Sequence, residues 1–497
     1  MNHLLAIDQG TTSTRSLLFD ASGRLVASAQ REFLQAYPQP GWVEHDPRTI
    51  WRDVLSTARE VIAKSFARVA AIGIANQRET TVVWSRATGT PIYPAIVWQD
   101  RRTAAECERL RWDGAEALVR ARTGLLLDPY FSATKLAWIL DHVAGARACA
   151  ERGELAFGTI DSFLLWHLTG GRAHATDAAN ASRTMLFDIH RQCWDGDLLG
   201  LFNIPEALLP EVHDNSFLYG VTAPGLFDEE IPVAGMAGDQ HAALVGQACL
   251  DAGMAKATYG TGCFFLLNTG QQALSPAKGT LTTIAYRMGG RPIYAVEGSI
   301  FCAGAALKWL RDRLDLIEDV SRTGAMAAEI GGNHGVYLVP AFTGLGAPYW
   351  DPDARGLICG LTLDSGPAHL VRAALESAAY QTLELMAAIT GGGGPPRALR
   401  VDGGMAANDW FCQFLADIIA APVERPAMLE ATAQGAAFLA GLTIGLFPDF
   451  AAISAAWACG ARFEPRMGGA ERERLIAGWR DAVQRTLTRR QDTHRIG

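Results

Sequence analysis

Two segments of one design, about half a chain apart, constrain the fold of this sequence most strongly. Residues 4–19 (LLAIDQGTTSTRSLLF) predict a strand, a tight turn and a second strand, because apolar runs flank a cluster of Gly, Thr and Ser. Residues 255–268 (AKATYGTGCFFLLN) repeat this plan around a turn at residues 260–262. The repetition indicates a duplicated architecture in which each half of the chain carries one hairpin.

Helix and strand signals alternate along the rest of the chain. Residues 47–67 have the pattern of an amphipathic helix that begins at a proline, and residues 69–77 (VAAIGIANQ) that of a buried strand. In the second half we predict helices over residues 366–389 and 408–419, with a strand over residues 398–404 between them. Such alternation is typical of a layered α/β fold.

The 497 residues suffice for two large domains or about three domain-sized units. We place the main boundary near residues 245–252, and we predict an N-terminal domain at residues 1–248 and a C-terminal domain at residues 249–463. The remaining residues, 464–497, are rich in Arg and Glu and predict a solvated helical tail that closes the chain.

Composition excludes several classes of function. The chain has 44 Lys and Arg against 52 Asp and Glu, so its formal charge is −8, and it contains no basic run. This balance argues against nucleic acid as a partner and against a polybasic membrane anchor, although a few local cations could still bind an anionic substrate. The nine Cys form no C-x-x-C pair and no Cys/His cluster, which argues against a zinc site and a disulfide framework and predicts reduced thiols in the cytoplasm.

Two apolar segments lack the full pattern of a membrane or secretory signal. The apolar run at the N-terminus ends at Asp8 and has no basic start. Residues 431–448 (ATAQGAAFLAGLTIGLFP) approach the length of a membrane span but contain three Gly, a Gln and a final Pro. We therefore predict a buried helix of small residues there and no membrane insertion.

The two turns are candidate phosphate-binding sites, because successive N–H groups and hydroxyls in a Gly-rich turn form a concavity for anions. Asp8, at the end of the first strand, is suited to holding a hydrated Mg²⁺. The chain has no G-x-x-x-x-G-K-[ST] motif, so a P-loop is excluded. For each turn alone, the alternative is an ordinary surface β-turn. The candidate phosphate ligands are Thr11, Thr12, Ser13, Arg15 and Thr261.

Asp239 is the candidate general base. It follows Gly238 just before the predicted boundary, where a carboxylate between the two halves could take a proton from an attacking hydroxyl. The alternative interpretation is that Asp239 caps the helix predicted over residues 241–250.

Arg78 and Glu79 directly follow the predicted buried strand and are suited to binding a polyol. Arginine donates hydrogen bonds to hydroxyl oxygens, and a carboxylate accepts them from hydroxyl hydrogens. Trp98 and Tyr130 could supply the apolar surface that the C–H face of a polyol needs. The alternatives are a solvated ion pair in a loop and two aromatic core residues.

Residues 402–408 predict a strand end, a Gly turn and the start of a helix. The Gly pair would permit close approach of a flat ring, and Asn408 could reach a purine or a ribose. The alternative is a turn followed by a helix cap. Lys308, one of only five Lys in the chain, is a further candidate, or simply an exposed helix residue.

Ten segments of the chain resemble, in the same order, those of the bacterial glycerol kinases in the FGGY carbohydrate kinase family, and the likeness spans nearly the whole chain. The segments are DQGTTSTR, GWVEHDP, GIANQRETT, AIVWQDRRT, DPYFSATK, TDAANASRTMLF, AGDQHAAL, TYGTGCF, VPAFTGLGAPYWDP and RVDGGMAAN. The resemblance implies two actin-like (ribonuclease H-like) domains with the active site in a cleft between them.

The resemblance also implies ATP-dependent phosphorylation of glycerol to sn-glycerol 3-phosphate, by a homodimer or homotetramer. Asp239 would be the general base, and it would lie with Asp8 at the Mg²⁺ site. The residues implied to bind glycerol are Arg78, Glu79, Trp98, Tyr130, Asp239, Gln240 and Phe264. Those implied to bind the nucleotide are Thr11, Thr12, Ser13, Arg15, Thr261, Gly304, Lys308, Gly404 and Asn408.

Some positions depart from the family pattern. Lys308 stands where well-known bacterial members have Gln. Residues 226–231 (LFDEEI) lack the Gly/Arg-rich loop that binds fructose 1,6-bisphosphate in some relatives, and residues 464–475 only loosely resemble the loop that docks a phosphotransferase protein. We expect inhibition by neither route. Two other functions stay open, namely a kinase for another polyol or a ketose such as xylulose or ribulose, and a non-catalytic ATP-binding actin relative.

Overall fold

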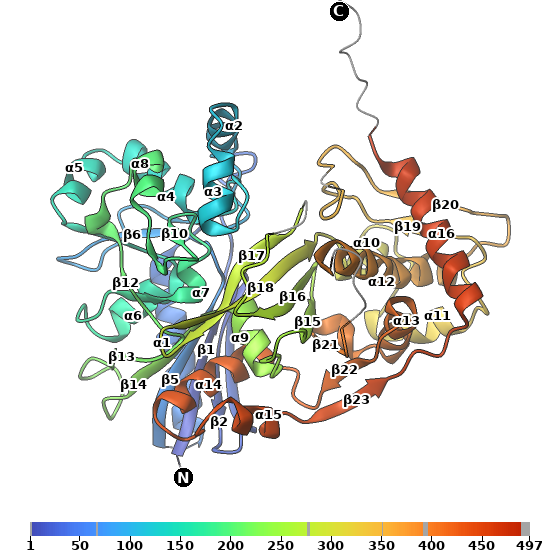
Figure 1. Cartoon of the computed structure of the whole chain (residues 1–497). Helices are drawn as coiled ribbons and strands as arrows, with labels where there is room; N and C mark the ends of the chain where they lie inside the picture. Colours follow the sequence, from blue (N-terminus) through green and yellow to red (C-terminus); the bar gives the residue numbers. More distant parts are fainter. Residues whose placement is uncertain (1, 66–67, 276–278, 350, 391–395, 489–497) are drawn as a thin grey trace, which may run out of the picture.

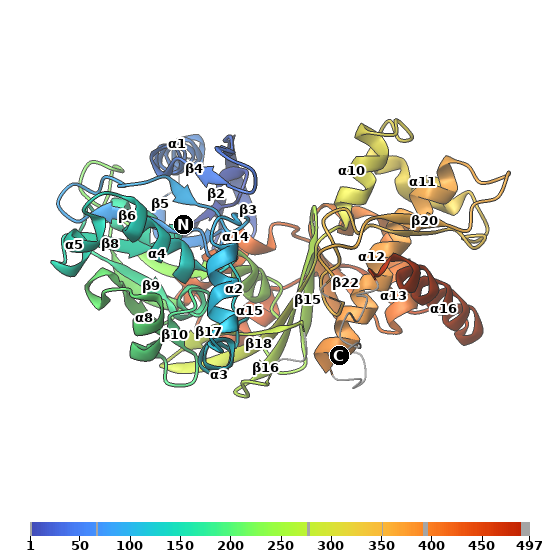
Figure 2. The same ribbon diagram turned by 90° about the horizontal axis from the view of Figure 1, so that it is seen from above.

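The computed structural model describes residues 2–65, 68–275, 279–349, 351–390 and 396–488. They form two α/β units that lie side by side, each built on one large sheet (Figures 1 and 2). The first sheet has the order β13 (Ser216–Val221), β14 (Pro232–Gly238), β5 (Arg68–Asn76), β1 (Asn2–Gln9), β2 (Ser13–Phe19) and β3 (Leu25–Glu32). The second has the order β17 (Leu281–Met288), β18 (Arg291–Ile300), β16 (Cys263–Gly270), β15 (Ala255–Tyr259), β21 (Leu399–Asp402), β22 (Val423–Pro426) and β23 (Cys459–Phe463).

The two sheets share one pattern of strand pairing. In the first, β1 is antiparallel to β2 and parallel to β5, which in turn is parallel to β14. In the second, β15 is antiparallel to β16 and parallel to β21, which is parallel to β22. Both predicted hairpins are confirmed, and so are the α/β class and the duplicated architecture inferred from them.

Helices and short strand pairs surround the two sheets. The helices are α1 (Pro47–Ser65), α2 (Ala104–Trp112), α3 (Glu116–Thr123), α4 (Ser132–His142), α5 (Ala146–Glu151), α6 (Ile160–Leu168), α7 (Ala178–Ala181), α8 (Gly196–Phe202), α9 (Asp239–Gly246), α10 (Gly304–Asp312), α11 (Thr323–Ala328), α12 (Pro367–Thr390), α13 (Asp409–Ile419), α14 (Ala431–Thr443), α15 (Phe450–Ala456) and α16 (Gly469–Thr486). The 3-10 turns are η1 (Glu206–Leu208), η2 (Val320–Arg322) and η3 (Gly404–Ala407). The short strands pair as β4 (Glu44–His45) with β7 (Ala95–Ile96), β6 (Val82–Ser85) with β8 (Leu155–Gly158), β9 (Ala175–Asp177) with β12 (Glu211–His213), β10 (Phe187–Asp188) with β11 (Cys193–Trp194) and β19 (Tyr337–Val339) with β20 (Leu357–Cys359).

Helix α14 joins the two units. It belongs to the C-terminal part of the chain, yet it packs on β14, β5 and β1 of the first sheet and crosses α9 (Figure 1). Its Phe438 shares one apolar core with Leu4 of the first sheet and Leu266 of the second. The buried helix of small residues predicted within 431–448 is confirmed, and none of the helices described here is long and apolar enough to cross a membrane. Because the first unit also uses residues beyond 248, the predicted domain boundary stays a prediction.

Glycines permit the close crossing of α9 and α14. A Cβ atom on Gly435 would lie 1.8 Å from the carbonyl oxygen of Ala242, and one on Gly246 would lie 1.9 Å from that of Ala431. Both neighbours are backbone atoms, so a side chain at either position would force the helices apart. The glycines of α9 and α14 therefore set the distance between these two helices.

We expect Gly435→Ala to lower the free energy of unfolding by about 1–3 kcal/mol or more, because a methyl group there overpacks the crossing. Urea denaturation measures this change. Gly200→Ala is the matched control, since Gly200 lies in α8 with no atom within 4 Å of its added Cβ, and it should be neutral or slightly stabilising. A Gly435→Ala protein as stable as the wild type would contradict the close crossing.

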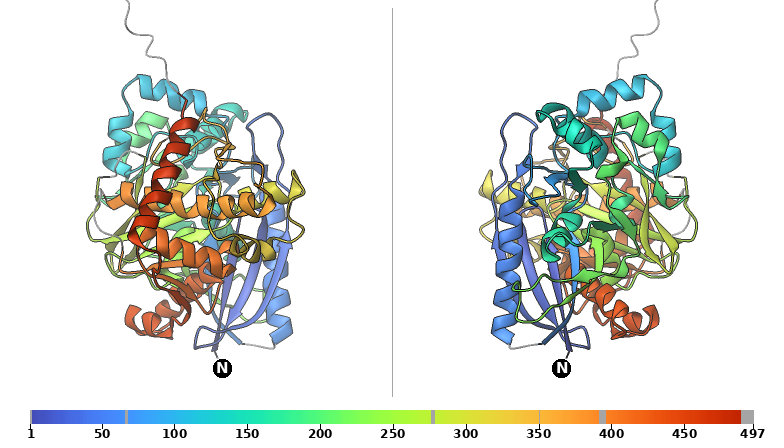
Figure 3. Two further views of the ribbon diagram at one scale, coloured as in Figure 1. Left: turned by 90° about the vertical axis from the view of Figure 1, so that its right-hand side faces the viewer. Right: turned by 90° about the vertical axis from the view of Figure 1, so that its left-hand side faces the viewer.

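Helix α16 corrects the prediction of a solvated C-terminal tail. One face of the helix is exposed, but Leu475, Trp479 and Val483 on the other face belong to the core of the second unit, where the Trp479 ring stacks on Tyr380 with centroids 5.2 Å apart. Figure 3 (left) shows α16 lying across the outer face of this unit. The predicted helix is confirmed, but the expectation that it is solvated was wrong, because its many charged residues hide an apolar stripe. Residues 489–497 lie outside the described residues.

Candidate active site between the two units

Arg78 and Glu79 leave the end of β5 in a strained turn. Strand β5 ends at Asn76, and Glu79 has a φ of 60°, which non-glycine residues adopt rarely and at a cost of about 1–3 kcal/mol. Both side chains are almost fully buried. The solvated loop pair considered as an alternative is therefore excluded.

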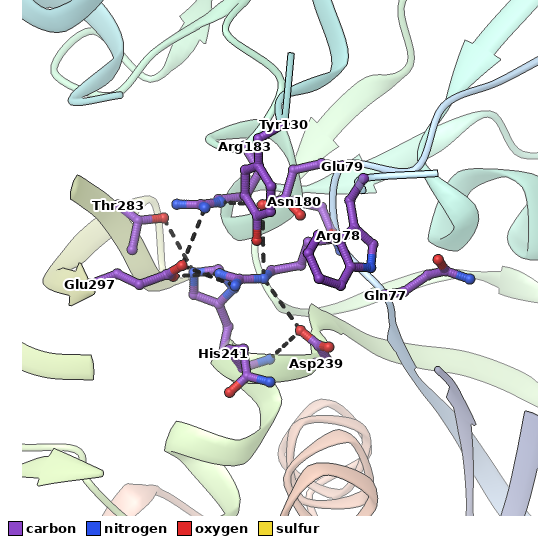
Figure 4. A network of polar contacts seen from close by, with 12 residues as sticks. Gln77, Arg78, Glu79, Tyr130, Asn180, Arg183, Asp239, His241, Thr283 and Glu297 are labelled. Carbon is purple, nitrogen blue, oxygen red and sulfur yellow. Dashed lines mark hydrogen bonds and ion pairs between the residues drawn. The ribbon is translucent and has the colours of Figure 1, made fainter. Parts of the chain in front are cut away.

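A carboxylate from the second unit holds Arg78. The two terminal nitrogens of Arg78 donate to the two oxygens of Glu297 in β18, at 2.5 and 3.0 Å, and its Nε lies 3.3 Å from Oδ1 of Asp239 (Figure 4). Glu79 accepts a hydrogen bond from Nε of Arg183 at 2.6 Å. This paired geometry fixes the orientation of the Arg78 guanidinium and links the units by buried charges.

The buried charges compensate one another. Burial raises the pKa of Glu79, although Arg78 and Arg183 act to lower it. Burial also opposes ionisation of Glu297, but Arg183 and Arg78 outweigh it and lower the pKa of Glu297 to about 2. Two arginines and two glutamates thus form a neutral buried group, which we call the charge quartet (Arg78, Glu79, Arg183 and Glu297).

Asp239 lies beside the quartet at the start of α9. Gly238 precedes it, and a Cβ on Gly238 would lie 2.6 Å from Cγ of Arg78. Only glycine therefore lets these two segments of the chain approach so closely. Asp239 is the first residue of α9, and its Oδ1 accepts the N–H of Gln240 in the first turn at 2.6 Å. The alternative of a capping role therefore stays open beside that of a base. Burial raises the pKa of Asp239, with Arg78 and Lys256 opposing this rise. Its side chain keeps 28% exposure, so an incoming hydroxyl could reach it.

Three half-buried aromatic rings stand next to these charges. Trp98 lies edge-on to Tyr130, with ring centroids 5.5 Å apart, and 6.5 Å from Phe264 at the start of β16. The guanidinium of Arg78 lies 5.7 Å from the Phe264 ring. The structure therefore brings together the predicted wall residues with Arg78, and Phe264 comes from the second unit.

The first hairpin contacts Trp98, one of the residues predicted to bind glycerol. Its charged residues, Asp8 and Arg15, form ion pairs within the protein. The Gly10 N–H donates to the carbonyl of Ser13 at 2.9 Å, and the indole N–H of Trp98 donates to the Thr11 hydroxyl at 2.9 Å. Arg15 forms ion pairs with Asp8 and with Glu430, which precedes α14. Thr12 at the tip is exposed.

The predicted nucleotide residues of the second unit converge around the second hairpin. The N–H of Gly304 donates to the carbonyl of Gly260 at 3.1 Å, and that of Ala303 to Thr261 at 2.9 Å, so the start of α10 rests on the turn. A Cβ on Gly403 would lie 2.4 Å from the carbonyl oxygen of Tyr259, which brings the 403–404 turn against the same strand end. Three loops therefore meet at one edge of the second sheet.

Three residues that were predicted to bind a ligand are exposed or have other partners in the structure. The Asn408 side chain caps α13 by accepting from the N–H of Phe411 at 3.1 Å, which is the alternative stated above. Lys308 is exposed on α10. The carbonyl oxygen of the Gln240 side chain accepts from the ammonium group of Lys256. Their roles in binding stay predictions.

Sequence reasoning assigned no role to four charged residues that complete the site: Arg183, Lys256, Glu297 and Glu430. Arg183 lies inside one of the family-like segments, where its motif gave a signal. Glu297 is the single acidic residue of the strand RPIYAVEGSI, and a charge in an apolar strand was a usable signal. Lys256 gave the same signal, as a charge in the first strand of the second predicted hairpin, and Glu430 stands in no recognisable pattern.

The donor set at the strand ends is compatible with Mg²⁺ carried by phosphates. Asp8 and Asp239 stand at the carboxyl ends of β1 and β14, and the charge of Asp8 adds to burial in raising the pKa of Asp239. Mg²⁺ commonly takes one or two protein carboxylates and fills its octahedron with phosphate and water oxygens. Across the described residues, no group of three or more His, Cys, Asp or Glu could hold a metal by itself. The residues therefore fit Mg²⁺ bound together with a nucleotide.

Comparison with known proteins places the chain in a family. Residues 3–246 match the FGGY family of carbohydrate kinases, N-terminal domain, and residues 255–444 match the C-terminal domain of that family. The chain belongs to the FGGY family of carbohydrate kinases.

Individual kinases of this family are similar to the chain over nearly its whole length. Glycerol kinase of Gluconobacter oxydans is 61% identical over 98% of this chain and 95% of that protein, and glycerol kinase of Rhodospirillum centenum is 58% identical over 97% and 98%. Among solved structures, glycerol kinase of Plasmodium falciparum with ADP has a TM-score of 0.93 and 37% identity, covering 98% of this chain and 99% of that one. Xylulose kinase of Rhodospirillum rubrum has a TM-score of 0.84 and 25% identity, covering 97% and 98%.

Proposed function

We propose that this protein transfers the terminal phosphoryl group of ATP to glycerol and forms sn-glycerol 3-phosphate and ADP. Full-length relatives at 57–61% identity are named glycerol kinase. The observation that carries the proposal is the contact between Arg78 and Asp239 beside three aromatic rings, because it combines a hydroxyl-binding cation, a base and an apolar wall. These are the groups that a small polyol needs.

The site residues divide the binding of glycerol between charge and apolar surface. In the proposal, Arg78 donates to hydroxyl oxygens of glycerol, and Glu79 accepts from its hydroxyl hydrogens. Tyr130 and Gln240 add polar contacts, while Trp98 and Phe264 cover the C–H face. Because Arg78 and Glu79 are buried, a ligand that leaves their remaining hydrogen-bonding groups without partners binds poorly, which gives the site its specificity.

Asp239 takes the proton of the attacking hydroxyl. The N–H of Gln240 and Nε of Arg78 both contact its Oδ1, and within the described residues no such contact falls on Oδ2. Oδ2 is therefore the oxygen that accepts the proton. Phosphoryl transfer needs mainly positioning and charge stabilisation. Asp8 and Asp239 would hold Mg²⁺, which would supply positive charge at the phosphates.

The two hairpins hold the nucleotide in this proposal. The turn at residues 11–13 with Arg15 and the turn at Thr261 contact the phosphates, and Gly304, Gly404 and Asn408 lie along the adenosine. Their support is the convergence of three loops around the second hairpin. A cytoplasmic location and a homodimer or homotetramer complete the proposal; all nine cysteines are unpaired thiols, as expected in a reducing compartment.

A substrate panel tests the proposed function. Purified protein with ATP and Mg²⁺ is given glycerol, xylulose, ribulose or gluconate, and ADP formation is followed by a coupled assay. We expect the highest kcat/KM for glycerol, no activity when Mg²⁺ is chelated, and little ATP hydrolysis without an acceptor. A preference for a ketose, or ATP turnover that does not depend on any acceptor, would contradict the proposal.

A further inference from the structure

Lys256 is a fully buried cation that no part of the proposed reaction yet uses. It lies in β15, three residues before the end of the strand at Tyr259, and its side chain is inaccessible to solvent. Its ammonium group donates to the side-chain oxygen of Gln240 and, at 2.9 Å, to the hydroxyl of Thr258. An ammonium ion in such a position is costly unless it is paired, so the fold keeps it there for its contacts.

The contacts of Lys256 lead directly to the candidate base. Gln240, whose side-chain oxygen Lys256 engages, donates its backbone N–H to Oδ1 of Asp239 at 2.6 Å. Lys256 also interacts electrostatically with Asp239 itself and with Asp402, which precedes the 403–404 turn. One buried cation thus contacts or faces the start of α9 in the first unit and two strands of the second.

We propose that Lys256 is a positioning residue, which fixes Gln240 and the Asp239 carboxylate relative to the second hairpin for phosphoryl transfer. This inference rests on the proposed function. Lys256 holds the Gln240 side chain, and the backbone N–H of the same residue holds Oδ1 of Asp239, so Lys256 acts through the orientation of the base. The charge of Lys256 also balances a buried carboxylate on each of the two units.

A positioning role predicts a specific kinetic signature. Lys256 touches neither substrate in this account, so its loss misplaces a group that acts during transfer and leaves ground-state binding nearly intact. We expect Lys256→Met to lower kcat for glycerol by about 10–100-fold, the size usual for removing a partner that orients a functional group. The dissociation constants for glycerol and for ATP, measured by calorimetry, should stay within about threefold of wild type, because kcat falls alone when only a transition-state interaction is lost.

Two further variants separate positioning from folding. Lys135 is another fully buried lysine, which donates to backbone carbonyls of Pro129 and Tyr130 and has no contact with Asp239. Lys135→Met should lower stability without the selective loss of kcat, and Lys256→Arg, which keeps the charge, should recover part of the kcat that Lys256→Met loses. If Lys256→Met does not fold, Lys256→Gln carries the same test, because it removes the positive charge and shortens the side chain by one atom while it leaves a polar group among the buried polar neighbours.

The outcomes distinguish this inference from the proposed function. Wild-type protein that does not phosphorylate glycerol would end both. Wild-type activity together with a folded Lys256→Met or Lys256→Gln protein of normal kcat would overturn the role of Lys256 alone. A variant that raises only KM, or in which kcat and stability fall as much as in Lys135→Met, would also overturn it, since that is the result of a structural role.

Discussion

Asp239→Asn is expected to lose glycerol-dependent turnover by about 10²–10⁴-fold, the range for removing a positioned general base. The amide has the size of the carboxylate and can still accept the N–H of Gln240 through its oxygen. Its NH₂ group, which replaces Oδ2, cannot accept the proton of the hydroxyl. The coupled ADP assay at saturating glycerol and ATP measures kcat, and calorimetry should show that the variant still binds ATP.

The control for Asp239→Asn is a buried carboxylate outside the site. Asp161 in α6 is fully buried and accepts hydrogen bonds from the hydroxyls of Thr159 and Thr176. Asp161→Asn should cost stability and leave kcat within tenfold of wild type. If Asp239→Asn turned over glycerol as fast as the Asp161→Asn protein, Asp239 would not be the base.

The elements that the sequence predicts best are those set by local chemistry. The hairpin at residues 4–19 is encoded by a Gly turn between two apolar runs, and the structure has β1 and β2 there. Helices α12 and α13 have strong local patterns and begin within one residue of the predicted positions. These features need no knowledge of distant residues, because turn geometry and amphipathic spacing determine them.

The features that the sequence did not predict depend on contacts between distant residues. Glu297 meets Arg78 across 219 positions of the chain, and Arg15 meets Glu430 across 415. The sequence singles out both arginines but does not pair them with Glu297 or Glu430, so only the meeting of distant segments shows what the charges do. The sequence also does not predict that α14 packs on the first sheet, because a helix of small residues has the same pattern whichever sheet it covers.

The rarity and the type of a residue indicated membership of the site less well than its burial in the structure. Lys308 drew attention because the chain has five lysines, but the structure exposes it, whereas Lys256 in the same small set is fully buried beside the candidate base. Asn408 suited a purine by its chemistry, yet its side chain caps a helix. A single sequence gives the type of each side chain but not its direction or its neighbours.

Arg78→Ala is expected to raise KM for glycerol about 10–100-fold and to leave KM for ATP nearly unchanged. Each hydrogen bond to a charged group contributes about 1.5–3 kcal/mol, and the truncation removes such donors from the acceptor side only. Steady-state kinetics with each substrate varied in turn measures the two constants. Arg78→Lys keeps the charge but not the paired geometry with Glu297, so it should recover only part of the affinity.

The same variant has a consequence for stability that depends on pH. The pKa of Glu297 is about 2 in the fold against an ordinary value of 4.5, so Glu297 stabilises the protein fully above pH 4.5 and this stabilisation is lost as the pH falls toward 2. Arg78→Ala removes one of the two arginines that lower this pKa. Acid unfolding, followed by circular dichroism, should therefore begin at a higher pH than in the wild type.

An unchanged glycerol KM in Arg78→Ala would remove Arg78 from the acceptor site even if the acid transition moved. An unchanged acid transition with a raised glycerol KM would instead mean that Arg183 alone holds Glu297 ionised. Arg183 contacts both Glu79 and Glu297. The double variant Arg78→Ala/Glu297→Gln therefore separates the role of Arg78 in binding glycerol from its role in keeping Glu297 ionised. Removing both partners abolishes the uncompensated buried carboxylate, so the double variant should regain stability but not affinity for glycerol.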